Sequence, residues 1–210
     1  MSQQPVSPSS PFQIGLLLRS SITECVVGCR ADQAGVPELG NLVRILVERD
    51  YHVYGLIANI QILDDMLIRQ LAAAAQPDPS ALIDNRYNRN QPLEISVLLT
   101  GYERGGNVSH LLPPRPPLSL SEIMVCQPFE VCRFTGHGRF GYFRHVLAAS
   151  HYPIAEILAA HLQQAYRHHQ AAGNAEWGRA AARELITLLR DDYATLAKVL
   201  GALSDTEITF

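Results

Sequence analysis

Short apolar segments, separated by glycine, proline or paired polar residues, dominate the chain from residue 12 to about residue 126. Several of them are rich in β-branched residues, and 51–62 alternates between a set that begins His52, Tyr54 and a set that begins Val53, Gly55. A period of two is typical of a strand, and Gly55 within it indicates a bulge or a close backbone approach. We therefore predict strands in the segments 12–21, 22–31, 35–50, 51–63, 93–103 and 121–126.

One segment inside this strand-rich region has a different pattern. Residues 64–75 combine Asp64 or Asp65, either of which can cap a helix, with a run of alanines that sustains one. We predict a helix there, followed by a short helical turn and a loop over 77–92.

The pattern changes after about Pro128, where apolar residues recur at spacings of three and four. The segments 141–151, 153–170 and 174–203 are predicted helices, and the last of them carries one apolar stripe that includes Leu185, Leu196 and Leu203. Strands that precede helices predict an α+β fold, because a parallel sheet needs the two to alternate. We divide the chain into a disordered polar leader (1–11), a strand region (12–126), an α-helical region (127–204) and a tail (205–210).

Four prolines surround Arg115 in the run Pro113-Pro114-Arg115-Pro116-Pro117. A polyproline ligand for a partner domain is one interpretation, although such ligands usually occupy long disordered linkers. This run lies between two predicted strands, where the missing amide protons of proline cost little. We favour a stiff lead-in to the strand at 121–126, with Arg115 directed toward the helical half.

The composition is that of a globular protein: 47% of the 210 residues are hydrophobic and the net charge is −3. No global field therefore attracts the chain to DNA or to an anionic membrane. The N-terminus lacks the basic and apolar regions of a secretory signal, and no segment approaches the ~20 apolar residues of a membrane span. We expect a cytoplasmic protein without membrane contact, in which the four cysteines (25, 29, 126 and 132) are small apolar side chains rather than metal ligands or disulfides.

Recognisable catalytic and cofactor motifs are missing from the sequence. Gly136 to Gly141 matches GxGxxG, but no strand follows in the last third of the chain, so a dinucleotide-binding unit cannot be completed. GxxxxGK[ST], GxSxG and HExxH are absent, and the histidines have no metal-ligand spacing. We predict no cofactor, no metal and no catalytic residue, and a surface or partner-facing role for the histidines, and we favour a non-enzymatic protein over an enzyme.

The segment 132–145 interleaves arginines and histidines with aromatic residues. Aromatic side chains beside arginines can stack on single-stranded bases, whereas a helix that buries its aromatics and solvates its arginines has the same pattern. The candidate contact residues are Arg115, Arg133, His137, Arg139 and Arg144.

The segments 39–60, 93–102 and 112–126 resemble parts of the HAS barrel, the small β-barrel shared by HerA-type ATPases and the rotary ATP synthase subunits. The similarity covers about residues 12–126 and ends where the ATPase motor would begin. The resemblance implies a barrel of five to seven strands with an inserted helix, followed here by three or four helices. It also implies a module that docks onto another component, as the HerA barrel caps the motor ring and contacts a nuclease.

Three functions follow as hypotheses. The first is a non-catalytic assembly or adaptor module that binds a protein partner, linked to a HerA-like ATPase or to DNA processing. The second is an enzyme or small-molecule binder whose site at the barrel–helix junction uses Arg115, Arg133, His137 and Arg139. The third is a binder of single-stranded nucleic acid, the less favoured kind of partner.

Overall fold

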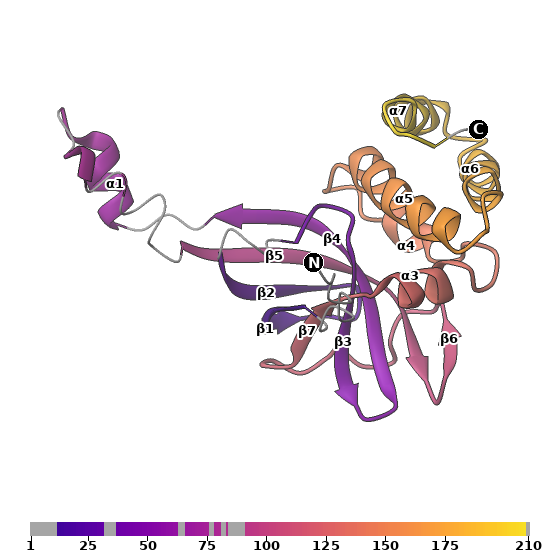
Figure 1. Cartoon of the computed structure of the whole chain (residues 1–210), viewed down its shortest axis with the longest axis horizontal. Helices are drawn as coiled ribbons and strands as arrows, with labels where there is room; N and C mark the ends of the chain where they lie inside the picture. The colour runs from indigo at the N-terminus through magenta and orange to yellow at the C-terminus, as the bar shows by residue number, and fades with distance from the viewer. Residues whose placement is uncertain are drawn as a thin grey trace, which may run out of the picture.

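The computed structural model describes residues 12–31, 37–62, 66–75, 78–80, 83 and 91–208. The chain is an α+β protein in which a closed six-strand β-barrel is followed by helices (Figure 1). The predicted leader and the proposed cap at Asp64 or Asp65 lie outside the described residues.

Seven strands form the sheet: β1 (Gln13–Ser20), β2 (Glu24–Ala31), β3 (Leu42–Glu48), β4 (Tyr51–Ile62), β5 (Gln91–Arg104), β6 (Asn107–Ser109) and β7 (Glu122–Val125). Six of them close into an antiparallel barrel in the order β1, β2, β5, β4, β3, β7. The seventh, β6, pairs with β5 across the Gly105-Gly106 turn and was not predicted from the sequence. The strand β7 lies between β1 and β3, so the short segment after the proline run completes the barrel.

Alternating side chains of the strands fill the barrel. This interior cluster consists of Ile14, Leu17, Cys25, Val27, Val43, Ile45, Tyr51, Val53, Ile57, Ile95, Val97, Leu99 and Ile123. Since successive side chains of a strand point to opposite faces, each strand can contribute every second residue to this core.

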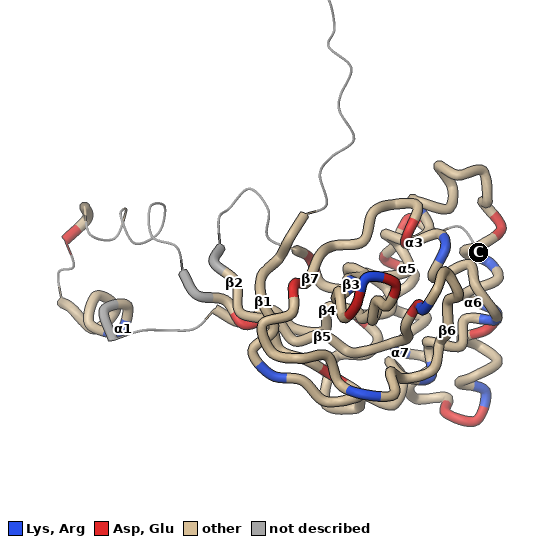
Figure 2. Tube along the Cα trace, turned by 90° about the horizontal axis from the view of Figure 1, so that it is seen from below, with Lys and Arg blue, Asp and Glu red and all other residues tan. Residues whose placement is uncertain are grey.

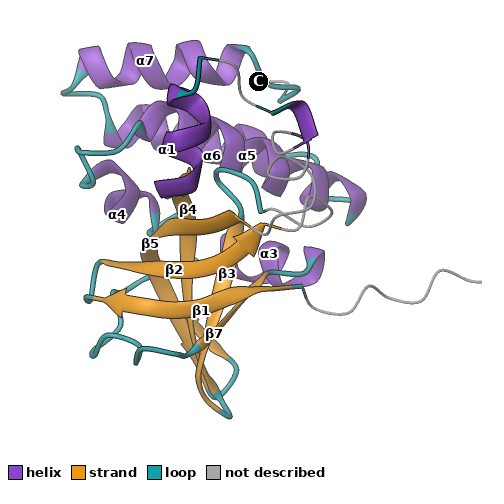
Figure 3. Cartoon of the chain, turned by 90° about the vertical axis from the view of Figure 1, so that its left-hand side faces the viewer, coloured by secondary structure: helices purple, strands orange, loops and turns teal. Residues whose placement is uncertain are grey.

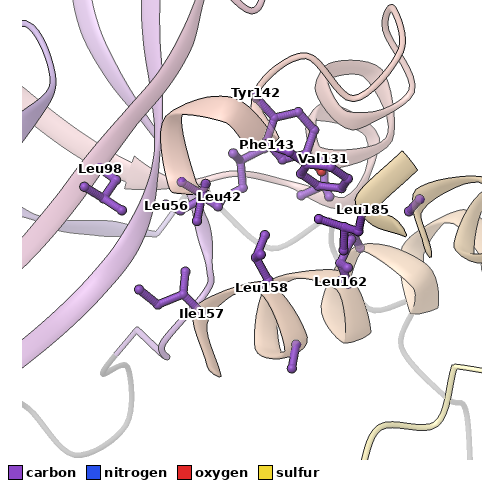
Figure 4. Close-up of a cluster of buried hydrophobic side chains, with 14 of the residues drawn as sticks. Leu42, Leu56, Leu98, Val131, Tyr142, Phe143, Ile157, Leu158, Leu162 and Leu185 are labelled. Atoms are coloured by element: carbon purple, nitrogen blue, oxygen red, sulfur yellow. The ribbon is translucent and has the colours of Figure 1, made fainter. Parts of the chain in front are cut away.

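Parts of β3, β4 and β5 are buried on their outer face as well. Tyr54 and Leu56 of β4, Leu42 of β3 and Leu98 of β5 belong to a second core that also contains the helices. Figure 4 shows Leu42, Leu56 and Leu98 opposite Ile157 and Leu158. These strands are therefore apolar on both faces, because the helices pack directly against the outside of the barrel.

The helices are α1 (Met66–Ala73), α3 (Pro128–Thr135), α4 (Phe143–Leu147), α5 (Ile154–Ala171), α6 (Trp177–Leu188) and α7 (Tyr193–Ser204). Helix α3 begins with Pro128 in its first turn and with a capping box between Gln127 and Glu130. Helix α5 is central, because it contacts α3, α4, α6, α7 and β4. Figure 3 shows α4 to α7 gathered at one end of the barrel, and Figure 1 shows α1 at the far end of the β4–β5 ribbon.

The prediction of one helix over 174–203 is wrong. The segment divides into α6 and α7, and together with α3, which precedes the predicted helices, five helices follow the barrel rather than three or four. Asp192 makes the break stable, because its carboxylate accepts a hydrogen bond from the Thr195 amide at 3.1 Å and caps α7. The apolar stripe is divided accordingly: Leu185 and Leu203 are buried, whereas Tyr193 is exposed.

The proline run is an internal part of the fold. Pro113 and Pro117 are buried, and Pro114, Arg115 and Pro116 are exposed between them. The residues that follow lie beside β1, since the Leu120 amide donates to the Leu17 carbonyl at 2.8 Å. The run thus leads directly into β7, the strand that closes the barrel.

Gly55 lies at a register shift between β4 and β5, as its position in the alternating pattern predicts. A Cβ atom at this position would lie 2.5 Å from Val97 Cγ1 and 2.7 Å from the Leu98 carbonyl oxygen. Glycine is needed here because β4 and β5 approach each other too closely for a side chain.

Two of the four cysteines, Cys25 and Cys126, are buried, and Cys29 and Cys132 are half-buried. Burial, followed by the charge of Glu24, raises the pKa of Cys25 to about 12. The Cys25 thiol is therefore protonated at neutral pH and serves as an apolar side chain of the barrel interior.

Candidate functional site

The predicted contact residues lie in two regions of the structure. Arg115 is exposed in the proline run, whereas Arg133, His137, Arg139 and Arg144 lie on α3, on the turn that follows it and on α4. Arg139 is exposed in that turn.

Arg133 belongs to a polar network that joins α3 to the barrel. Its guanidinium pairs with Glu103 of β5, whose carboxylate also accepts a hydrogen bond from the Tyr54 hydroxyl at 2.9 Å. Glu103 is buried. The burial of Tyr54 itself is the main reason why the pKa of Tyr54 is raised. A second pair, Arg44–Glu130 at 3.0 Å, links β3 to α3.

His137 and Arg144 meet at residue His110, which lies between β6 and the proline run. The His110 carbonyl oxygen accepts hydrogen bonds from the Arg144 guanidinium and, at 2.8 Å, from Nε2 of His145. The His110 ring lies 5.8 Å from the His137 ring and donates from Nε2 to the Phe134 carbonyl at 3.0 Å. We call His110, His137, Arg144 and His145 the histidine cluster.

The sequence prediction missed His110 and His145, because no motif spacing relates residues 110 and 145. Burial lowers the pKa of both side chains. The Nε2–H group of each therefore donates its hydrogen bond from a neutral ring, which leaves Nδ1 as an acceptor. Within the described residues no three His, Cys, Asp or Glu side chains converge in a way that would hold a metal ion.

A pocket of about 230 Å³ lies at the barrel–helix boundary, next to the histidine cluster. Its walls come from the start of β2, the middle of β5, the residue before the proline run, and the end of α4 with the turn that follows it. The lining residues are Thr23, Glu24, Leu98, Leu99, Leu112, His145, Ala148, Ala149 and His151. None of the residues expected at a junction site, Arg115, Arg133, His137 and Arg139, belongs to this lining.

A smaller hollow of about 170 Å³ lies on the other side of Glu24. It is lined by Arg19, Ser20, Ser21, Glu24, Cys25 and Val26, all from the β1–β2 connection and its flanking strands. Glu24 therefore separates two concave regions at one end of the barrel.

The aromatic residues between 134 and 143 are not available for stacking on bases. Phe134, Tyr142 and Phe143 are fully buried, and Phe140 packs against the same core. Basic and acidic positions are interspersed along the chain (Figure 2). This segment therefore buries its aromatic side chains in the core and exposes its arginines to solvent, as the alternative interpretation of its pattern predicts.

The outer face of β1 carries exposed leucines. Leu16 and Leu18 are 40% and 47% exposed, and Leu118 and Leu120 are 76% and 71% exposed. Residues 117–121 lie beside β1. The Leu120 amide donates a hydrogen bond to the Leu17 carbonyl, and the Ser119 hydroxyl donates one to the Leu18 carbonyl at 3.2 Å. We call Leu16, Leu18, Leu118 and Leu120 the leucine face.

The prediction of a surface role for the histidines is wrong for His110, His161 and His169, which are all buried. His161 and His169 lie on the same side of α5 as Leu158, Leu162 and Ala165, which face the core. The three-and-four spacing of α5 contained this signal, since positions 158, 161, 162, 165 and 169 form one stripe of a helix.

None of the described helices is long and apolar enough to cross a membrane. No protein-family model and no curated protein matches the chain.

Proposed function

We propose that the protein is a non-catalytic assembly module that docks onto a partner protein through the leucine face. The observation that carries this proposal is the exposure of Leu16, Leu18, Leu118 and Leu120 on adjoining backbone segments. Isolated exposed leucines are normal, but several that adjoin one another are typical of an interaction surface.

The topology of the barrel favours contact through side chains over strand addition. The strands of the closed barrel pair on both sides, and the sheet ends at β6, a strand of three residues. Little free backbone is available for a partner strand. A partner therefore has to recognise a side-chain surface, and each leucine that is fully buried contributes about 1.5–3 kcal/mol.

The resemblance of residues 12–126 to HAS barrels supports a class of partner. The sequence has no phosphate-binding loop, and its only lysine is Lys198. The energy-consuming step of such a complex would therefore reside in another chain. We propose a HerA-type ATPase or another component of DNA processing as that partner.

The test compares a leucine-face variant with a matched surface variant. L18E/L118E should lose the partner, whereas L188E, which changes a leucine of α6 with 44% exposure, should keep it. The protein and both variants would be mixed with a purified HerA-type ATPase from the same source, and complex formation would be followed by light scattering. Equal binding by both variants would exclude the leucine face as the docking surface, and no complex with the wild type would exclude this class of partner.

A second copy of the chain is the alternative occupant of the leucine face. Sedimentation of the purified protein alone decides this point. A dimer that L18E/L118E dissociates would show that the leucine face serves self-association, and it would contradict the proposed partner.

A further inference from the structure

The pocket at the barrel–helix boundary combines an apolar floor with a charged rim. Leu98, Leu99, Leu112 and Ala149 supply apolar walls, and Glu24 lies at the end of β2 nearest to α4. Ligand sites in proteins commonly have this composition, a mainly apolar lining with a few polar groups that orient the ligand.

Glu24 has unused capacity to accept hydrogen bonds. His151 Nε2 and the Tyr152 hydroxyl each lie 3.4 Å from its Oε2 atom, and these distances are long for hydrogen bonds. In the part of the chain that the structure describes, Glu24 forms no ion pair with an arginine or lysine, and both of its polar side-chain contacts are to Oε2. A carboxylate can accept about four hydrogen bonds, so a donor with positive charge would complete this group.

His145 adds a second acceptor to the same pocket. Its Nε2–H group is engaged by the His110 carbonyl oxygen at 2.8 Å, which leaves the Nδ1 lone pair of the neutral ring. Thr23 also lines the pocket, and its hydroxyl lies 3.1 Å from the Ser21 hydroxyl. Together these groups favour a ligand that donates several hydrogen bonds, and the carboxylate disfavours an anion.

We propose that this pocket binds the ammonium end of a short linear alkyl chain. Glu24 pairs with the charge, and the leucine and alanine walls cover the methylene groups. An ammonium group has three donors and no acceptor, which matches an acceptor-rich rim. The same chemistry occurs in a free alkylamine and in the side chain of a lysine from another protein.

Titration of the labelled protein with n-butylamine, followed by amide chemical shifts, tests the proposal. We expect saturable shifts at the start of β2 and in α4, and much weaker binding of n-butanol and n-butyrate. If butanol binds as well as butylamine, the charge plays no part and the proposal is wrong. Absence of saturable binding overturns it as well.

Two variants connect the binding to the pocket without disturbing the fold. Glu24→Gln keeps the size of a half-exposed side chain and should weaken butylamine about tenfold or more, because a charge-assisted hydrogen bond is lost. Ala148→Leu fills the pocket from an exposed position and should weaken it to a similar degree. The matched control Glu94→Gln changes a carboxylate of β5 that pairs with Arg19, outside this pocket, and should leave binding unchanged. If Glu24→Gln binds as tightly as the wild type, Glu24 does not hold the ammonium group.

A second probe distinguishes the two possible sources of the ammonium group, a free amine and a lysine side chain. N-acetyl-lysine methylamide carries the same alkylammonium chain on a peptide backbone. Tighter binding of this probe than of butylamine assigns the pocket to a lysine of a partner protein, and binding of butylamine alone assigns it to a free amine. Because the pocket lining contains no residue of the leucine face, L18E/L118E should bind butylamine normally even where docking fails.

Discussion

His161 of α5 is hydrogen bonded to Gly40 of the connection that leads into β3. Its Nδ1 atom lies 3.0 Å from the Gly40 carbonyl oxygen, and its Nε2 atom lies 3.0 Å from the Tyr142 hydroxyl. Since a carbonyl only accepts, Nδ1 donates, and the neutral ring then accepts the Tyr142 proton at Nε2. One buried side chain thus joins the barrel, the α3–α4 connection and the central helix.

The first prediction concerns acid stability. Burial, as the largest effect, lowers the pKa of both His161 and His169 from 6.5 to about 4. Between these values the unfolded chain binds more protons than the folded one, so the free energy of unfolding falls as the pH decreases from about 6.5 to about 4. For His161 alone the loss reaches about 3 kcal/mol, at 1.36 kcal/mol per pKa unit.

Urea denaturation at pH 7.5, 6.0 and 5.0 measures this dependence. His161→Gln should be less stable at pH 7.5 and should lose less stability on acidification than the wild type. His137→Gln, at an exposed histidine, should keep the wild-type slope. A slope that His161→Gln leaves unchanged would mean that other groups cause the acid sensitivity.

The second prediction concerns Gly40, whose φ of 76° lies in the left-handed region. A Cβ atom there would lie 2.5 Å from the His161 amide nitrogen, so neither backbone can move away easily. We expect Gly40→Ala to destabilise the protein by more than about 1 kcal/mol in thermal or urea unfolding. Gly201→Ala, in α7 with open space around its Cβ, should stabilise it by about 0.5–1 kcal/mol.

The third prediction concerns the Arg133–Glu103 pair. Arg133→Ala should cost about 1–2 kcal/mol, because among the described residues it leaves the buried Glu103 carboxylate with the Tyr54 hydroxyl as its one hydrogen-bond partner. Tyr54→Phe in the Arg133→Ala background tests whether the network is coupled, in which case the two effects will not add. Arg179→Ala removes an exposed pair with Glu176 and should change stability by less than about 0.5 kcal/mol.

The fourth prediction concerns the break between α6 and α7. Asp192→Ala removes the cap on the Thr195 amide and should lower the thermal midpoint by about 2–4 °C. Asp191→Ala, which changes a neighbouring residue that does not cap the helix, should have little effect. Equal midpoints for Asp192→Ala and the wild type would show that packing alone defines the start of α7.

The strands and the order of the two halves were predictable because they depend on local periodicity. The alternation in 51–62 and the glycine at position 55 correspond to β4 and to its register shift with β5. The three-residue strand β6 was missed, since so short a segment shows no period. The break at Asp192 was missed because the apolar spacing continues across it, and only the cap on Thr195 distinguishes two helices from one.

The candidate site could not be predicted in the same way. The interpretation of Arg133, His137 and Arg144 as contact residues stays a prediction, although the structure engages Arg133 with Glu103 and Arg144 with His110. The pocket joins Glu24 of β2 to His145 of α4, residues 121 positions apart in the chain. No local pattern relates such residues.

The sequence by itself determined most of the strands and helices, with β6 and the break at Asp192 as exceptions, since hydrophobic period and capping residues act within a few positions. It also determined that β7 follows a stiff proline lead-in. Only the tertiary structure decided that β2 pairs with β5 to close the barrel, that the outer face of β4 is buried, and that His161 reaches Gly40. The reason is physical: burial and hydrogen bonding between distant segments depend on how whole elements pack, and neither is contained in the pattern of any one segment.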